Sequence, residues 1–221
     1  MPRVAAFFDM DRTVLTVNTA TLWVKYQHKR GEISRFKLIR SLGWAMRYRL
    51  ALIDVETVAR RVVADLAGSW EHDMIEKCRR WYDEEIHHTI AGAARKAIQI
   101  HREQGHRLVL LTAGTSYVAG PLAQALGLDA VLCSRLETRD GRFTGRLDGP
   151  ACVGKWKVAA SERWAEREGV DLSRCSFYTD SYSDLAMLER VGEPKVVNPD
   201  PRLLRVARRR GWPVMSWDGR K

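Results

Sequence analysis

The chain has 221 residues, 45% of them apolar, which suits one compact domain or one domain with a modest insertion. No stretch approaches the ~18 consecutive apolar residues of a membrane-spanning helix, and the first residues lack a signal-peptide core, so we expect a cytoplasmic protein. The net charge of +10 is compatible with nucleic acid, anionic lipid or an anionic substrate, although an arginine-rich enzyme can simply be basic. Because no nucleic-acid-binding module is recognisable, we expect no nucleic-acid partner.

The first predicted element is a buried strand over the apolar run 4–8, which ends at Asp9. Residues 19–86 are predicted to be almost wholly helical, because apolar residues recur there at helical spacing and nothing alternates like a strand. The expected breaks between these helices are Gly31, Asp54 and Gly68-Ser69.

Beyond about residue 88, helical and strand patterns alternate. The expected helices are 91–104, 116–126, 154–167, 184–191 and 201–210, and the expected strands are 108–111, 130–132, 176–178, 195–197 and 213–215. Asp140-Gly141, between two short extended runs, is typical of a hairpin turn. This alternation favours βαβ units. The predicted fold is α/β, with a Rossmann-like, mostly parallel sheet formed by 1–17 and 88–221 and a helical cap at 18–87 inserted after the first strand.

Several polar residues are predicted to meet at one edge of this sheet, because ligands of parallel sheets bind beyond the carboxyl ends of the strands. They are Asp9 and Asp11 after the first strand, Thr112 at the end of the second, Asp180 and Asp184 after the strand 176–178, and Lys157 in the first turn of a helix.

These residue types suit phosphoryl transfer. Asp9 can act as a nucleophile, since carboxylates form aspartyl-phosphates, and Asp11, two residues further along an extended chain, can act as general acid and base. Mg²⁺, which prefers oxygen ligands, suits Asp9 and Asp180. Thr112 and backbone N–H groups near it, such as that of Ala113, are candidates for binding the phosphate oxygens.

The ordered motifs resemble those of the haloacid dehalogenase superfamily. The similar segments are Asp9-Met10-Asp11-Arg12-Thr13, the strand 108–111 with Thr112, Lys157, and Asp180-Ser181-Tyr182-Ser183-Asp184. The helical insert and the segments 140–146 and 197–200 are similar to the phosphoserine-phosphatase-like branch. The third motif of that family is a lysine, and its spacing to the following Val158 favours Lys157 over Lys155 as this residue.

The resemblance implies a Mg²⁺-dependent phosphatase that hydrolyses a small phosphate monoester. It implies that Asp9 is the nucleophile, that Asp11 is the general acid and base, and that Asp9, the backbone carbonyl of Asp11 and Asp180 bind Mg²⁺. Asp184 would orient the metal site from behind these ligands, or would cap the helix that follows it.

Two positions concern the substrate. Asn18 stands where phosphoserine phosphatases resembling this chain carry a glutamate that pairs with the substrate ammonium. Because asparagine lacks the charge, a bond of about 1.5–3 kcal/mol is missing, and we expect no strict specificity for phosphoserine. Arg61 aligns with a cap arginine that binds the substrate carboxylate, or it lies on a solvated helix face. Arg12, where the family commonly has a small residue, either reaches the substrate or points at solvent.

Other functions are compatible with the motifs. A phosphotransferase or mutase would use the same residues, whereas a non-catalytic binding protein would be expected to have damaged motifs. A lysophospholipid phosphatase at the membrane surface is a further alternative, because basic and aromatic residues crowd together early in the insert. The same mixture is expected of a cap helix packed on a core. These residues are Lys25, Lys29, Arg30, Arg35, Lys37, Arg40, Arg47 and Arg49, with Trp23, Tyr26, Phe36, Trp44 and Tyr48. The oligomeric state is left open.

Overall fold

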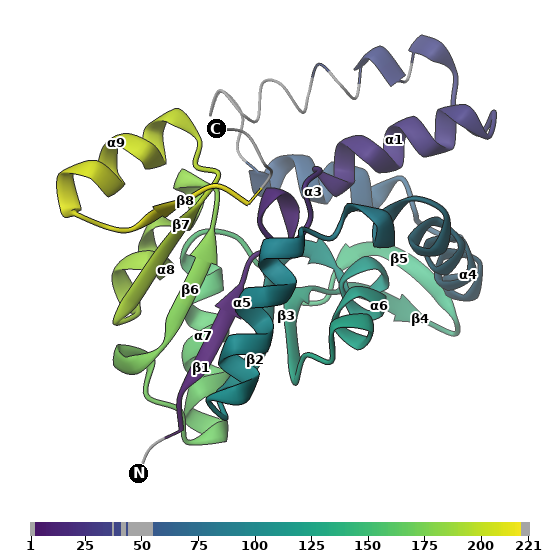
Figure 1. The fold of residues 1–221 in the computed structure, drawn as a ribbon. Helices are drawn as coiled ribbons and strands as arrows, with labels where there is room; N and C mark the ends of the chain where they lie inside the picture. The colour runs from purple at the N-terminus through teal and green to yellow at the C-terminus, as the bar shows by residue number, and fades with distance from the viewer. Residues whose placement is uncertain (1–2, 37, 41–42, 44–54, 218–221) are drawn as a thin grey trace.

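The computed structural model describes residues 3–36, 38–40, 43 and 55–217, and its centre is a parallel sheet of six strands in the order β3-β2-β1-β6-β7-β8 (Figure 1). The strands are β1 (Ala5–Phe8), β2 (Arg107–Thr115), β3 (Ala130–Ser134), β6 (Ser176–Thr179), β7 (Glu193–Val197) and β8 (Val214–Met215). Every pair of neighbours in this sheet is parallel. The predicted α/β class is therefore confirmed.

Helices cover both faces of the sheet (Figure 1). They are α5 (Gly92–Glu103) and α6 (Ser116–Leu126) on one face, and α7 (Lys155–Glu168), α8 (Leu185–Arg190) and α9 (Pro201–Arg210) on the other. Because successive side chains of a strand point to opposite faces, β1 contributes to two cores. Phe8 packs in the core with Ile98 of α5, whereas Phe7 packs in the core with Trp164 of α7.

The ends of α9 show how local sequence sets these boundaries. Asp200 precedes the helix, and its carboxylate accepts hydrogen bonds from the amides of Arg202 and Leu203. Pro201 begins the helix, where its missing N–H has no partner to lose. Gly211 ends it with a φ of 66°, in the left-handed region that glycine adopts without strain.

The insert after β1 is helical wherever the structure describes regular structure in it. It contains α1 (Thr19–Lys29), α3 (Val55–Ala64) and α4 (Glu71–Trp81), followed by a turn over Tyr82–Ile86. Two predicted breaks, Gly31 and Gly68-Ser69, fall between helices as expected, and the third, Asp54, lies outside the described residues.

A hairpin separate from the main sheet forms hydrogen bonds with the insert. Its strands are β4 (Leu136–Arg139) and β5 (Arg142–Leu147). Backbone amides of Gly68 and Glu71 donate to the carbonyls of Phe143 and Gly141 at 2.9 Å each, and the amide of Phe143 donates to the carbonyl of Ser69 at 3.0 Å. We call these three bonds the hairpin ladder, and they tie the segment between α3 and α4 to the hairpin.

A cation–π contact reinforces this attachment. The guanidinium of Arg142 lies 3.5 Å from the ring centre of Trp70 and also donates to the carbonyl of Gly68 at 2.6 Å. The last residue of α3 and the turn after it pack so closely on β5 that a Cβ at Gly145, whose φ is 81°, would lie 3.4 Å from Cα of Ala64 and 2.9 Å from Cβ of Ala67.

One predicted strand end was wrong. Strand β2 does not end at Thr112 but continues to Thr115, with a register shift against β3 between Leu111 and Thr115. The hydroxyl of Thr112 accepts a hydrogen bond from the amide of Gly114 at 3.0 Å, which holds a local turn before pairing resumes at Thr115 with Ser134. The apolar run in the sequence corresponds only to the buried part of the strand, so the predicted strand ended at the bulge.

Some of the basic and aromatic residues early in the insert are buried and others are exposed. Trp23 and Tyr26 pack against Trp81, with ring centres 4.8 Å and 6.3 Å apart, whereas Phe36 is 74% exposed. No described helix is long and apolar enough to cross a bilayer. Of these basic and aromatic residues, the ones that lie outside the described residues are Lys37, Trp44, Arg47, Tyr48 and Arg49.

Candidate active site

Four side chains form a buried cluster at the carboxyl ends of β1 and β6, and we call them the lysine cluster. The ammonium of Lys157, in the first turn of α7, donates at 2.7 Å to Oδ1 of Asp9 and at 2.7 Å to Oδ2 of Asp184. The hydroxyl of Thr179, the last residue of β6, donates to the same oxygen of Asp184 at 2.7 Å. Asp9 is 7%, Lys157 3% and Asp184 2% exposed, so these charges meet almost without solvent.

Burial and the neighbouring charges act against each other in this cluster. Burial raises the pKa of Asp9 to about 7, Asp184 and Asp11 add to the rise, and Lys157 opposes it. Burial alone would lower the pKa of Lys157, but the carboxylates of Asp184 and Asp9 raise it above its ordinary value. Lys157 is therefore held as an ammonium ion, with two carboxylates on it.

Asp11 is held separately, at the start of the insert. The amide nitrogen of Asn18 donates to Oδ2 of Asp11 and the backbone amide of Thr19 donates to Oδ1, both at 3.0 Å. Burial raises the pKa of Asp11, and the bonds from Thr19 oppose the rise. A carboxyl with a raised pKa, fixed by hydrogen bonds, can act as a general acid.

Asn18 is engaged at both ends of its side-chain amide. Besides its bond to Asp11, its carbonyl accepts hydrogen bonds from the amide and the hydroxyl of Thr21, so it caps α1. The structure therefore gives Asn18 a role in holding Asp11 that the sequence did not indicate, and its contact with substrate stays a prediction.

Asp180 supplies a further carboxyl group just beyond β6. Burial raises its pKa well above the ordinary value, and repulsion from Asp9 and Asp184 adds to the rise, while the charge of Arg12 opposes it. Within the described part of the chain, no hydrogen bond reaches the carboxylate of Asp180, whereas those of Asp9, Asp11 and Asp184 all accept one. This carboxylate is thus available to an external cation.

The donor set fits Mg²⁺. Asp9 and Asp180 are oxygen donors in a site with surplus negative charge, which a hard divalent cation would relieve. No three acidic, histidine or cysteine side chains of the described residues are gathered so as to enclose an ion by themselves. The predicted site needs only two carboxylates, because its third ligand is the backbone carbonyl of Asp11.

Asp184 does not cap the helix that follows it. It directly precedes α8, but its side chain makes no capping hydrogen bond, because its carboxylate binds Lys157 and Thr179 instead. The capping alternative is therefore wrong.

The remaining predicted residues are less closely tied to the lysine cluster. Thr112 is buried and bonds to Gly114, and Ala113 is exposed, with its carbonyl accepting from the hydroxyl of Ser134 at 2.9 Å. Arg61 is exposed on α3. The structure does not bury Arg61 among the acids.

Sequence reasoning missed two residues that contact this edge of the sheet. Thr179 was not among the predicted site residues, yet it donates to Asp184. Asn198 was noted only within a branch motif, yet its side chain donates to the carbonyl of Arg12 at 3.0 Å. An asparagine directly after a strand was the available signal, since asparagine tolerates the left-handed region.

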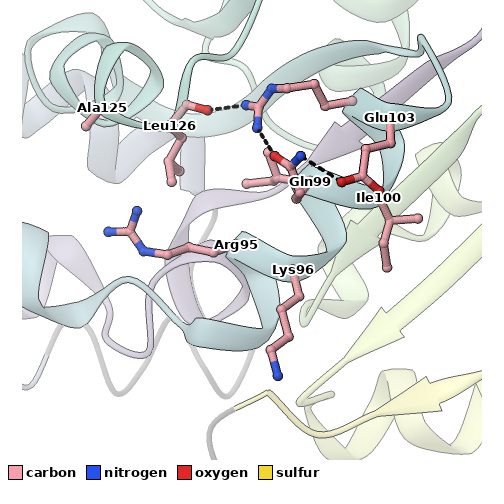
Figure 2. Close-up of a pocket in the computed structure, with 9 residues that line it drawn as sticks. Arg95, Lys96, Gln99, Ile100, Glu103, Ala125 and Leu126 are labelled. Carbon is pink, nitrogen blue, oxygen red and sulfur yellow. Dashed lines mark hydrogen bonds between the residues drawn. The ribbon is translucent and has the colours of Figure 1, made fainter.

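A hollow between α5 and α6 lies apart from these acids. Figure 2 shows its lining, in which the guanidinium of Arg102 donates to the side chain of Gln99 at 2.8 Å and to the carbonyl of Leu126 at 2.6 Å. Gln99 donates in turn to Glu103 at 2.8 Å. None of the predicted site residues lines it, and several of its polar groups satisfy one another, so we assign it no part in catalysis.

Comparison with known proteins identifies the family of the chain. Residues 6–189 match the model of the haloacid dehalogenase-like hydrolase family. The phosphoserine phosphatase SerB1 of Mycobacterium tuberculosis is 34% identical over 96% of this chain and 70% of its own. The histidinol-phosphatase of Neisseria meningitidis is 27% identical over 96% of this chain and 98% of its own.

Solved structures share the fold. A Bordetella pertussis protein of unknown function has a TM-score of 0.88 at 28% identity and covers 97% of this chain and 99% of its own. A phosphoserine phosphatase solved as an analogue of its phospho-aspartyl intermediate has a TM-score of 0.74 at 19% identity, with 100% and 96% covered. At that identity the second likeness concerns the fold alone.

Proposed function

Because the chain belongs to the haloacid dehalogenase-like hydrolase family and is an enzyme of the phosphatase type, we propose that it hydrolyses a small phosphate monoester through an aspartyl-phosphate on Asp9, with Mg²⁺ as cofactor. The observation that carries the proposal is the position of Asp9. Its carboxylate is buried at the end of β1, paired through Oδ1 with Lys157, and close in sequence to a separately held Asp11.

The first half of the reaction uses both acids. A carboxylate oxygen of Asp9 attacks phosphorus, and the bond from phosphorus to the leaving oxygen breaks as the new bond forms. Asp11 gives its proton to the leaving oxygen, which departs as an alcohol. Because Lys157 binds Oδ1 of Asp9, Oδ2 is the oxygen left for attack.

The second half restores the enzyme. Asp11, now ionised, takes a proton from water, and that water attacks phosphorus and breaks its bond to Asp9. Inorganic phosphate leaves, and Asp9 again pairs with Lys157. Asp184 and Thr179 keep the lysine in place throughout, since both contacts lie outside the reacting atoms.

Mg²⁺ would be held by the carboxylates of Asp9 and Asp180 and by the backbone carbonyl of Asp11. When bound, it supplies positive charge between the anionic nucleophile and the anionic phosphate. Asp184 orients this site through Lys157, which it shares with Asp9.

The proposal extends to the substrate contacts. Thr112 and the amide of Ala113 bind phosphate oxygens, and Arg61 binds an acidic group of the substrate. Asn18 brings no charge for an ammonium and is occupied with Asp11 and Thr21, which supports a substrate that is not strictly phosphoserine. A small phosphorylated metabolite is therefore the expected class.

The proposal also divides the chain. The core is formed by 1–17 and 88–221, and the cap by 18–87, whose first residues hold Asp11. All four cysteines are free thiols, which supports a reducing compartment such as the cytoplasm.

The decisive variant is Asp9→Asn, which keeps the shape of the side chain but removes the nucleophilic charge. We expect kcat for p-nitrophenyl phosphate with Mg²⁺ to fall by about 10³-fold or more. The matched control is Asp83→Asn at an exposed acid, which should leave kcat unchanged. Activity that survives Asp9→Asn would exclude the covalent route.

A substrate screen then separates the alternatives. Phosphoamino acids, histidinol phosphate, sugar phosphates, nucleotides and lysophospholipids should be compared with Mg²⁺ present, with and without an added acceptor alcohol. We expect free phosphate to be the main product, and we expect the activity with phosphoserine not to exceed by far the activity with the other substrates. Quantitative transfer to the alcohol would instead indicate a phosphotransferase, and a preference for lysophospholipid in vesicles would indicate a membrane-surface enzyme.

A further inference from the structure

The loop that carries Asp9 and Asp11 contains a residue in an unfavourable backbone conformation. Arg12 has a φ of 57°, in the left-handed region, where a side chain other than that of glycine meets steric resistance. Such conformations persist only where surrounding contacts impose them. The backbone of Arg12 has two such contacts, since its amide donates to the carbonyl of Val17 at 3.0 Å and its carbonyl accepts from Asn198 at 3.0 Å.

Asn198 comes from the far end of the chain and is itself in the left-handed region, with a φ of 43°. It directly follows β7 and is separated from Arg12 by 186 positions in sequence. Both ends of its side-chain amide are used, because its nitrogen donates to Arg12 while its oxygen accepts from the amide of Trp217 at 2.8 Å.

The C-terminal segment holds Asn198 in turn. The amide of Asn198 donates to the carbonyl of Met215 in β8 at 2.9 Å. The ring of Trp217 stacks on Tyr178 at 5.3 Å, and Tyr178 stacks on Phe8 at 4.8 Å, so the segment is packed onto β6 and β1. A continuous set of contacts therefore joins the C-terminal segment to the loop that carries the two acids, at the residue that follows Asp11.

We propose that Asn198 is a positioning residue, which acts through the carbonyl of Arg12 to hold Asp9 and Asp11 in their reactive arrangement. The inference rests on the proposed function for its catalytic consequence. Its structural part does not, because a loop that loses this bond should relax whether or not the enzyme is a phosphatase.

The need for Asn198 should depend on the residue at position 12. Arginine requires an external contact to stay in the left-handed region, whereas glycine adopts that region freely. A glycine at position 12 should therefore make the bond from Asn198 dispensable. This dependence distinguishes positioning of the loop from a general effect on stability.

The experiment is a double-mutant cycle with Asn198→Gly, Arg12→Gly and the double variant. Asn198→Gly keeps a residue that accepts the φ of 43° and removes only the side-chain bonds. With Arg12 present, we expect it to lower kcat for p-nitrophenyl phosphate by about ten- to a hundredfold with little change in KM, since misplaced reacting groups slow the chemical step. With glycine at position 12, the same change should lower kcat less than about twofold.

A second readout does not require activity. Amide hydrogen exchange of the peptide 10–17 should be faster in Asn198→Gly than in the parent, and the two glycine-12 proteins should differ little from one another. An equal loss of kcat in both backgrounds, or an unchanged exchange rate in this peptide, would overturn the inference. If the parent protein hydrolyses no phosphate ester, the proposed function fails, while the exchange experiment still decides the role of Asn198.

Discussion

Two buried polar clusters lie on opposite faces of the sheet, and each holds a buried basic side chain in a different way. On the side of α7, Lys157 is charged and is paired with Asp9 and Asp184. On the side of α5, His101 bonds to Nδ1 of His106 at 2.8 Å and to the hydroxyl of Tyr178 at 2.9 Å. The three residues of this second group are here called the histidine cluster.

The difference lies in what faces the buried nitrogen. Lys157 faces two carboxylates, so its charge is favoured despite burial. Burial lowers the pKa of His101 to about 4, and His106 and Lys195 lower it further, while Glu193 opposes the shift. The charge of Lys157 is therefore favoured by two carboxylates that bond to it directly, whereas His101 bonds to a histidine and a tyrosine and its charged form is disfavoured. The charged cluster is the one that lies at the proposed catalytic edge.

The largest expected effect comes from breaking the lysine cluster. Lys157→Met removes the ammonium while keeping much of the side-chain volume, and leaves Asp9 and Asp184 buried against each other. We expect a loss of about 3–5 kcal/mol in the free energy of unfolding, measured by urea denaturation at pH 7.5, together with loss of activity.

The matched control for that variant is Lys155→Met, at the exposed lysine two positions earlier. It should change the free energy of unfolding by less than about 0.5 kcal/mol. Equal effects of the two substitutions would contradict the assignment of Lys157 to the buried cluster.

The pH dependence of stability tests the histidine cluster. In the folded protein His101 takes up a proton only near pH 4, whereas in the unfolded chain it does so near its ordinary value of 6.5. For this residue the unfolded state therefore binds more protons between these values, so the contribution of His101 to stability falls as the pH is lowered from 6.5 towards 4. The raised pKa of Asp9 acts in the opposite direction, so the contribution of His101 is read from a variant and not from the parent protein alone. We expect this contribution to fall by about 2 kcal/mol between pH 7.5 and pH 5.

Urea denaturation at pH 7.5 and pH 5 measures that contribution. His101→Gln should show a smaller loss between the two pH values than the parent protein. His72→Gln, at an exposed histidine of α4, should behave like the parent. If the loss is as large in His101→Gln as in the parent, other groups control the acid sensitivity.

The smallest expected effect comes from a single hydroxyl. Tyr178→Phe keeps the stacking against Phe8 and Trp217 but removes the partner of Nε2 of His101. We expect a loss of about 1 kcal/mol in the free energy of unfolding. A loss several times larger would mean that the cluster acts as a cooperative network rather than as separate bonds.

The sequence predicted the fold because its signals were local and repeated. Apolar runs marked the buried strands, helical periodicity marked the insert, and Asp140-Gly141 marked the hairpin. The end of β2 was misplaced because its last residues are less buried and follow a bulge, so they carry no apolar signal.

The candidate site was predicted only at the level of residue identity. The spacing of Asp9 and Asp11 suggested their chemistry, but not that Asn18 and Thr19 hold Asp11. The bond from Asn198 to Arg12 spans 186 positions, and no pattern within a short window contains both residues. Such contacts depend on how distant elements come together, which periodicity cannot report.

The hairpin ladder has a consequence for protein engineering. The insert after β1 is continuous in sequence, which suggests a module that can be exchanged between enzymes by grafting residues 18–87. Gly68, Ser69 and Glu71, however, share backbone hydrogen bonds with Gly141 and Phe143, which lie outside that range. A chimera that transplants the helices alone would present unmatched donors and acceptors at this seam. The transferable unit is therefore discontinuous, and a graft must carry the hairpin along with the helices it supports.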